Sequence, residues 1–535
     1  MDWNSTDKDA AKVALAIIKL PAVVPVTDPR YGGTILVNPG GPGASGVNMI
    51  LGQGRRLQKI VDSQAMPISV QQNFKGPQTV DDKYYDIVGF DPRGINNTTP
   101  RYQCFTDPHS RQRWSLANEF LDLLGSSTVA TEQAWGRAMA LSATCTRKDG
   151  PEIGQFMNTT PTAADILEII ERLGEWRENA AEAIIASKPT VPEIQRQRIR
   201  DATRWRKGAE LLQYWGFSYG TVLGATFAAM YPHRVKRVVL DGVCDSQSMY
   251  SGYWTANVLD TDKIIDMFFE ICHQAGPEKC SFAIGNNVEG MRDTLDKTLT
   301  SLNETPLAVP GSDTRGPDII TYSDLMRFIK DSVYEPLTKF PLLADVLADV
   351  SHGNGSILAD LKSEHKVPIC SGDNTQNGLK ACPAYEETFL ETLASIGCTD
   401  GEDRSGLTKQ DFFDYYKVLK GQSRWMADIW ASFTMPCWGW KTRPKWRYEG
   451  PISGSPAHPI LWIGNTMDPA TPLRNAYKMA ERFSGSAVLE QESAGHCTYS
   501  ADSKCTAENI RRYFHTGILP GEGTRCDADK MPFGV

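Results

Sequence analysis

One short segment of the sequence has the spacing that places a serine on a sharp turn. Residues 216–220 read Gly-Phe-Ser-Tyr-Gly, and they lie between an expected strand and an expected helix. A Gly-x-Ser-x-Gly sequence in that setting is typical of a turn that presents a nucleophilic serine, here Ser218. The pentapeptide alone is a weak signal because it also occurs by chance, so an ordinary glycine-rich turn is the alternative.

A serine hydroxyl is a weak nucleophile at neutral pH, so it needs an imidazole that accepts its proton. The chain has eight histidines, and His496 alone follows a late expected strand in a glycine-flanked loop. We therefore predict that His496 is the general base. Three others are interpreted as packing, surface or helix-end residues: His233, His458 and His515.

The imidazole in turn needs a carboxylate that fixes its tautomer, and this acid should end the strand before the histidine. Asp468 lies just beyond the expected strand at 460–464, and Pro469 follows it. We predict Asp468 as the acid. The alternatives are that Asp468 only caps the following helix, or that Glu492 is the acid instead.

The oxyanion of an acyl-transfer intermediate needs two backbone N–H donors. One is predicted to be the amide of Tyr219, directly after the serine. The glycine loop after the first strand would supply the second, and we choose Gly41. The alternative for this same loop is phosphate binding, which is disfavoured because no Gly-Lys-Ser/Thr sequence follows it. Pro39 and Pro42 have no N–H, which leaves three candidates in that loop: Gly40, Gly41 and Gly43.

Short apolar runs that end in glycine or polar loops alternate with helical patterns on both sides of a long interruption. Expected strands are 33–38, 85–90, 211–215, 235–240, 460–464 and 487–490; expected helices are 162–173, 221–231, 473–483 and 507–515. Gly174 is expected to end the first of these helices. This order predicts an α/β protein with a mostly parallel, doubly wound sheet and an inserted, mainly helical cap.

The predicted domain division follows from that interruption. Residues 1–240 form the first part of the core and include a charged helical insertion at 175–210. Residues 241–459 form the cap, and residues 460–535 complete the core.

Composition limits the class of protein. Of 535 residues, 41 % are hydrophobic and 22 % charged, which is ordinary for a folded domain. The net charge is −8 without a basic block, so no nucleic-acid partner is predicted. No apolar run reaches the ~18 residues that span a bilayer, so no membrane association is predicted.

Twelve cysteines lack zinc-ligand spacing, and we predict local disulfides for the close pairs Cys272/Cys280, Cys370/Cys382 and Cys497/Cys505. Several Asn-x-Ser/Thr sequons point to a glycoprotein on a secretory route: Asn4, Asn96, Asn97, Asn158, Asn303 and Asn354. The first residues contain no signal peptide. We expect that the sequence begins late; a genuinely intracellular protein is the alternative.

Several motifs together resemble the α/β-hydrolases, in the tripeptidyl aminopeptidase-like branch of the prolyl aminopeptidase-related serine peptidases. These motifs are residues 38–43, 89–94, 158–160, 216–220, 464–472 and 495–496. The resemblance covers nearly the whole chain. It implies a secreted serine exopeptidase without a metal or other cofactor, in which cap carboxylates between residues 245 and 455 hold the substrate's ammonium group.

The sequence departs from that family in two places. Residues 1–3 look like the tail of an N-terminal element whose beginning is absent. Residues 175–210 lengthen the path from helix to serine turn, which can reshape the rim of the site and its specificity.

Three functions remain open. The leading one is an acyl-enzyme peptidase that releases short peptides or proline-linked residues from a free N-terminus, with Ser218, His496 and Asp468 as its triad. An esterase or lactonase acting on a small metabolite is the second, because this fold hosts many reactions. A binding protein or non-hydrolytic enzyme that reuses the serine turn is the third.

Overall fold

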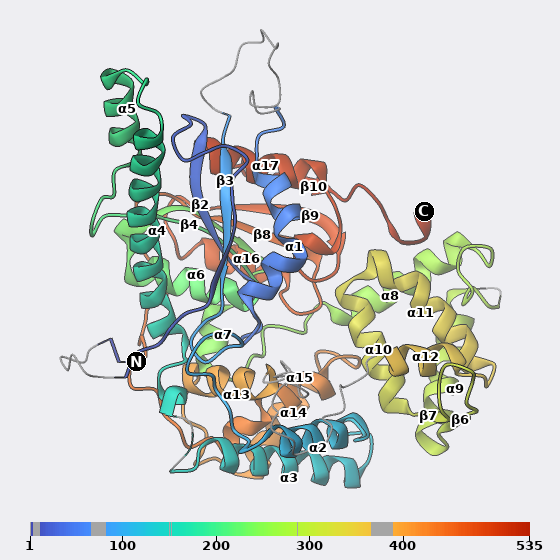
Figure 1. The fold of residues 1–535 in the computed structure, drawn as a ribbon. Coiled ribbons are helices and arrows are strands. Elements are labelled where there is room, and N and C mark those ends of the chain that lie inside the picture. Colours follow the sequence, from blue (N-terminus) through green and yellow to red (C-terminus); the bar gives the residue numbers. More distant parts are fainter. Residues whose placement is uncertain are drawn as a thin grey trace.

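The computed structural model describes residues 2–3, 11–65, 82–148, 150, 152–285, 287–364 and 389–535. Its centre is an eight-stranded sheet in the order β1-β3-β2-β4-β5-β8-β9-β10, with helices on both faces (Figure 1). Every neighbouring pair in this sheet is parallel except β1 and β3, so the predicted fold class is confirmed. The strands are β1 (Ile17–Leu20), β2 (Tyr31–Asn38), β3 (Tyr84–Phe90), β4 (Leu212–Phe217), β5 (Val235–Asp241), β8 (Leu461–Met467), β9 (Ala487–Ala494) and β10 (Arg525–Asp527), with a separate hairpin of β6 (Leu307–Val309) and β7 (Asp318–Ile320).

The strands form because their apolar runs are buried on both faces of the sheet. All six residues of β4 are buried, and alternate side chains enter two different cores. Tyr214 lies in one core, whereas Trp215 and Phe217 lie in the other. All six predicted strands are present. β8 and β9 extend beyond their predicted ends because the polar residues there continue the ladder, a pairing that apolar periodicity does not reveal.

Helices cover both faces of the sheet. On one face α1 packs against α17, and on the other α4 packs against α6. The central strands β3 and β4 are therefore buried along their whole length. The helices of these layers are α1 (Gly46–Val61), α4 (Thr159–Ser187), α6 (Tyr219–Met230), α16 (Leu473–Ala480) and α17 (Lys504–Thr516).

Two further groups of helices lie outside these layers. In Figure 1 one group lies below the sheet and the other lies to its right. The lower group is α2 (Pro108–Glu119), α3 (Thr128–Cys145), α13 (Phe389–Asp400), α14 (Lys409–Lys420) and α15 (Ala427–Thr434); the other is α8 (Thr261–Ala275), α9 (Val288–Glu304), α10 (Tyr322–Tyr334), α11 (Pro336–Ser351) and α12 (Ser356–Glu364), and the short α7 (Ser246–Ser251) follows β5. The lower group thus includes α2 and α3, which precede the predicted cap in sequence. The domain boundaries after residues 240 and 459 stay a prediction.

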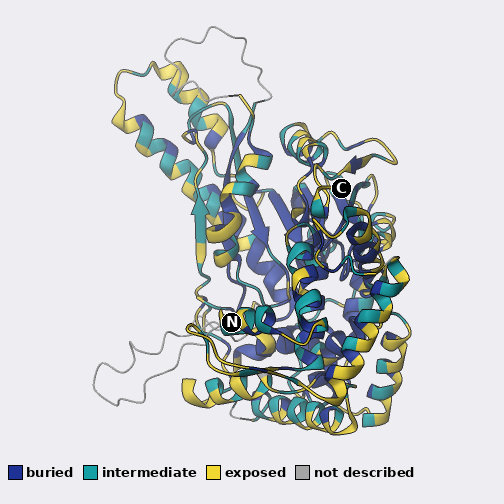
Figure 2. Cartoon of the chain, turned by 90° about the vertical axis from the view of Figure 1, so that its right-hand side faces the viewer, coloured by how far each residue is buried: buried dark blue, intermediate teal, exposed yellow. Residues whose placement is uncertain are grey.

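The charged insertion at 175–210 is helical. The helix before it was predicted to end at Gly174, and this prediction is wrong. α4 runs through Gly174 to Ser187, and α5 (Glu193–Thr203) folds back beside it. This hairpin projects from the molecule, with many exposed residues (Figure 2). A Cβ atom at Gly174 would lie 2.6 Å from the side chain of Glu210. The glycine therefore allows close packing inside the helix and does not terminate it.

Four disulfides are present among the described cysteines: Cys104–Cys145, Cys272–Cys280, Cys398–Cys437 and Cys505–Cys526. The predicted Cys272–Cys280 pair is confirmed. The predicted Cys497–Cys505 pair is wrong, because Cys505 bonds to Cys526 on the adjacent β10 and Cys497 is a buried free thiol. Cys370 and Cys382 lie outside the described residues. None of the helices described has the length and apolarity that crossing a bilayer requires.

Candidate active site

Ser218 occupies the turn between β4 and α6, as predicted. Its backbone angles are φ 55° and ψ −125°, a conformation that non-glycine residues rarely adopt. The flanking glycines allow this turn, because a Cβ at Gly216 would meet the carbonyl oxygen of Gly220, and one at Gly220 would lie 2.7 Å from that of Asn38. The turn is also held by a hydrogen bond from the Ser218 amide to the Asp241 carbonyl, at 3.0 Å. The backbone therefore fixes the position of the serine side chain.

Asp468 and His496 are in direct contact after the ends of β8 and β9. His496 Nδ1 lies 2.9 Å from Asp468 Oδ1 and 3.1 Å from Oδ2, and both residues are buried. Three backbone amides also donate to the carboxylate, from Ala470, Thr471 and Cys497, at 2.8–2.9 Å. Burial alone would raise the pKa of Asp468, but His496 and these amides reverse that effect and hold it below its usual value. Asp468 is therefore a carboxylate in contact with the imidazole.

Two residues that the sequence analysis did not identify hold the histidine in place. Thr471 Oγ1 lies 3.2 Å from His496 Nδ1, beside the carboxylate. The Asn465 side chain donates to the carbonyls of Gly495 and Cys497, at 2.8 Å each. Asn465 directly follows the expected strand at 460–464, and Thr471 lies three residues after the acid; these positions were the only signals in the sequence.

Asp241, the last residue of β5, connects the serine turn to the histidine loop. Its carbonyl accepts the Ser218 amide and also lies 3.6 Å from Cys497 Sγ. Its carboxylate accepts the amide and the hydroxyl of Thr498, at 2.9 and 2.5 Å. The structure thus joins His496 directly to Asp468, and it joins Ser218 to the residue after His496 through one shared carbonyl.

The glycine loop after β2 lies against the serine turn. A Cβ at Gly40 would be 2.9 Å from the Tyr219 amide nitrogen and 3.0 Å from Ser218 Cβ, and Gly40 has φ +92°. The Gly40 amide donates to the Asn38 side chain at 3.0 Å, so it is not available as a donor to an oxyanion. Within the described residues, the Gly41 and Tyr219 amides have no assigned acceptor. Their role as the pair of oxyanion donors stays a prediction.

Helix α13 covers this loop and reaches the residue after the serine. Phe389, at its start, would lie 3.2 Å from a Cβ at Gly41. At its end, the buried Asp400 carboxylate accepts hydrogen bonds from the Thr159 hydroxyl, at 2.6 Å, and from the Tyr219 hydroxyl, at 3.0 Å. One helix therefore contacts both sides of the predicted oxyanion site.

Replacement of Asp400 by asparagine is expected to stabilise the protein more at about pH 8 than at about pH 4. Burial raises the pKa of Asp400 from 3.8 to about 6. The folded state therefore binds the proton more tightly than the unfolded chain, and this stabilisation, present below pH 3.8, is lost as the pH rises through about 6. The loss corresponds to about 3 kcal/mol. Urea midpoints of both proteins at the two pH values measure it, and a pH-independent difference between variant and parent would contradict it.

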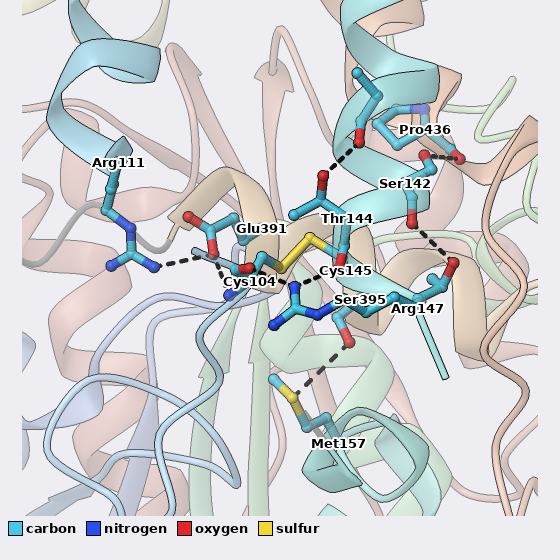
Figure 3. The surroundings of a disulfide bond; sticks show 12 residues. Cys104, Arg111, Ser142, Thr144, Cys145, Arg147, Met157, Glu391, Ser395 and Pro436 are labelled. Carbon is cyan, nitrogen blue, oxygen red and sulfur yellow. Dashed lines mark hydrogen bonds and ion pairs between the residues drawn. A yellow bond between two sulfur atoms is a disulfide. The ribbon is translucent and has the colours of Figure 1, made fainter. Parts of the chain in front are cut away.

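Two groups of metal-ligand atoms occur among the described residues, and the atoms of both already have partners. In the first, Cys104 and Cys145 form a disulfide, and Glu391 accepts from the Cys104 amide and pairs with Arg111 (Figure 3). In the second, the Asp468 carboxylate contacts His496 Nδ1 and accepts from the Cys497 amide, and Cys497 Sγ donates to the Asp241 carbonyl. Neither group offers the free, deprotonated ligands that a metal site needs.

Glu492, the alternative acid, and His515, interpreted as a packing or surface residue, make contacts with other groups. Glu492 pairs with Arg525 at 3.2 Å and accepts from the Thr466 hydroxyl. His515 Nε2 lies 2.8 Å from the Val61 carbonyl oxygen, in the packing of α17 against α1.

Comparisons with known proteins find sequence similarity to other hydrolases. The family profile of the alpha/beta hydrolase fold matches residues 33–271, and that of TAP-like proteins matches residues 423–526. "Serine protease Hip1" of Mycobacterium tuberculosis is 22 % identical over 98 % of this chain and 85 % of its own. "Tripeptidyl aminopeptidase" of Streptomyces lividans is 22 % identical over 94 % and 78 %, and "Carboxylesterase B" of M. tuberculosis 22 % over 98 % and 84 %. The chain therefore has the α/β-hydrolase fold, and the comparisons support a serine hydrolase that is similar to TAP-like proteins.

Proposed function

We propose that the protein is a serine exopeptidase that removes short peptides or proline-linked residues from a free N-terminus. The observation that carries this proposal is the buried Asp468–His496 pair, whose loop is linked through the Asp241 carbonyl to a serine with its backbone held at φ 55°. Groups of these types perform acyl transfer on many folds, and the chain order serine, acid, histidine is the one found in α/β-hydrolases.

In the proposed mechanism Ser218 Oγ attacks the carbonyl carbon of the substrate while His496 Nε2 accepts its proton. Asp468 keeps the other ring nitrogen, Nδ1, protonated and stabilises the imidazolium. The amides of Gly41 and Tyr219 donate to the oxyanion. His496 then protonates the leaving amine, and a water molecule, deprotonated by the same imidazole, releases the acyl group from Ser218.

The names of two relatives, serine protease and tripeptidyl aminopeptidase, support a peptidase, and the second name and the TAP-like profile support exopeptidase specificity. The position of α13 over the glycine loop also supports it, because a helix there restricts the space around the serine. Glu391 and Asp400, the buried carboxylates of α13, already bind other groups of the chain. We therefore expect a different cap carboxylate to bind the ammonium group.

An esterase of small molecules is the second candidate, and the relative named carboxylesterase B favours it. We place the protein in an oxidising compartment outside the cytoplasm, which the four described disulfides support.

A substrate comparison tests the proposal. Tripeptide and proline anilides with a free N-terminus are expected to be hydrolysed, whereas the same anilides with a blocked N-terminus are rejected. Simple aryl esters serve as the chemical control, because both candidate enzymes cleave them. Ester hydrolysis without anilide hydrolysis would favour the esterase, and failure of a fluorophosphonate probe to label Ser218 would reject both.

A further inference from the structure

A cavity lies at the N-terminal ends of the central strands, whereas Ser218 follows the C-terminal end of β4. Its volume is about 260 Å³, slightly below the ~300 Å³ at which typical small-molecule pockets begin. It is lined by the first residues of β2, β4 and β5. The hairpin of α4 and α5 supplies the other wall. The insertion at 175–210 thus builds this cavity and lies away from the rim of the candidate active site.

The lining of the cavity is rich in positive charge, although the chain as a whole has a net charge of −8. Four cationic side chains and one carboxylate line it: Arg177, Arg204, Arg206, Lys236 and Glu210. Arg177 pairs with Glu210 at 2.8 Å, and Arg204 pairs with Asp201 at 3.0 Å. Neither Lys236 nor Arg206 forms an ion pair with any carboxylate that the structure describes. Two cationic side chains of the lining thus make no ion-pair contact with a described carboxylate, and Glu210 balances Lys236 only in part.

Lys236, which lines the cavity, lies at an irregularity in the pairing of β4 with β5. Leu212 pairs with Val235 and Gln213 pairs with Arg237, so Lys236 is the extra residue of a β-bulge. Bulges redirect side chains and occur often beside functional sites. A second irregularity, at Gly32 on β2, lies in the same wall. Two breaks in register thus adjoin one small cavity.

The ammonium group of Lys236 is held there at an energetic cost. Burial, together with the charges of Arg237, Arg177 and Lys83, lowers the pKa of Lys236 to about 8, and the Glu210 carboxylate opposes this effect only in part. A bound anion would offset both the desolvation and the repulsion between these cations.

We propose that this cavity binds a small oxyanion of the phosphate class, with Lys236 and Arg206 as its charged contacts. Guanidinium and ammonium groups are donors without acceptors, so they match an anion that offers several oxygens. Inorganic phosphate and the phosphate group of a small monoester share this chemistry. The site is separate from Ser218, so binding does not require the proposed hydrolysis.

Calorimetric titration of the full-length protein tests the site, with inorganic phosphate and glycerol 3-phosphate as ligands at constant ionic strength. We expect saturable binding of at least one of them, and tighter binding of the monoester would mean that the cavity takes a larger molecule. Lys236→Met and Arg206→Met should each weaken binding ~10-fold or more. The matched control is Lys207→Met, because Lys207 is an exposed neighbour that does not line the cavity.

A second measurement separates the site from general charge effects. Affinity of the parent protein should fall between about pH 7 and about pH 9 as Lys236 loses its proton, and it should fall less in Lys236→Met. Absence of saturable binding, or equal weakening in Lys207→Met, would overturn the proposal.

Discussion

Replacement of Ser218 by alanine is expected to lower kcat by ~10⁴–10⁶-fold on aryl esters and on any peptide anilide that the protein cleaves. The variant loses only the hydroxyl that attacks the substrate, while the turn keeps its hydrogen bond from the residue 218 amide to the Asp241 carbonyl. Its unfolding midpoint should therefore change little. Steady-state rates and fluorophosphonate labelling of the purified variant measure the effect.

Two control variants make this result specific. Ser187→Ala removes a hydroxyl at the far end of α4 that bonds only within its own helix, and it should keep full activity. Cys244→Ala removes the thiol next to the Ser218 side chain. Burial raises the pKa of Cys244 to about 12, so this thiol stays protonated and is a poor nucleophile. Full activity of Ser218→Ala, or loss of activity in Cys244→Ala, would contradict the assignment of Ser218 as nucleophile.

The sequence predicts the parallel sheet and the positions of the three triad candidates because each depends on a local pattern. An apolar run that ends in a glycine turn defines a strand end, and the ends of parallel strands meet at one edge of the sheet. Ser218, Asp468 and His496 each follow such a run. The contact of Asp468 with His496 is therefore a consequence of topology, and the same topology predicts that Ser218 meets them.

Features that depend on contacts between distant segments were not predictable in this way. Cys505 has two possible partners at short range, and only the placement of β10 beside β9 favours Cys526. Gly174 has the sequence setting of a helix end. Its actual role depends on Glu210, a residue distant in sequence whose side chain packs against it. The contact of Asp400 with Tyr219 likewise joins a cap helix to the serine turn, and no local pattern in either segment indicates it.

Replacement of Asp468 by asparagine is expected to lower kcat by ~10⁴-fold while the chain still folds. The carboxylate accepts hydrogen bonds from three amides and from His496 Nδ1, so every one of its contacts is with a donor. An asparagine can accept with its oxygen, but its NH₂ group must face a donor. If it faces His496, the ring has to accept at Nδ1 and carry its proton on Nε2. The imidazole then cannot accept the proton of Ser218.

The same substitution should also reduce stability, because an NH₂ group that faces a buried amide leaves both donors unpaired, at a cost of about 1–3 kcal/mol. Glu492→Gln is the matched control. Glu492 is the alternative acid from the sequence, its side chain is 43 % exposed, and it pairs with Arg525 rather than with His496. We expect its kcat to stay within about twofold of the parent, since exposed ion pairs contribute little. If Glu492→Gln were inactive and Asp468→Asn active, the acid of the triad would be Glu492, and the loop that holds His496 would have to be arranged differently from the structure described.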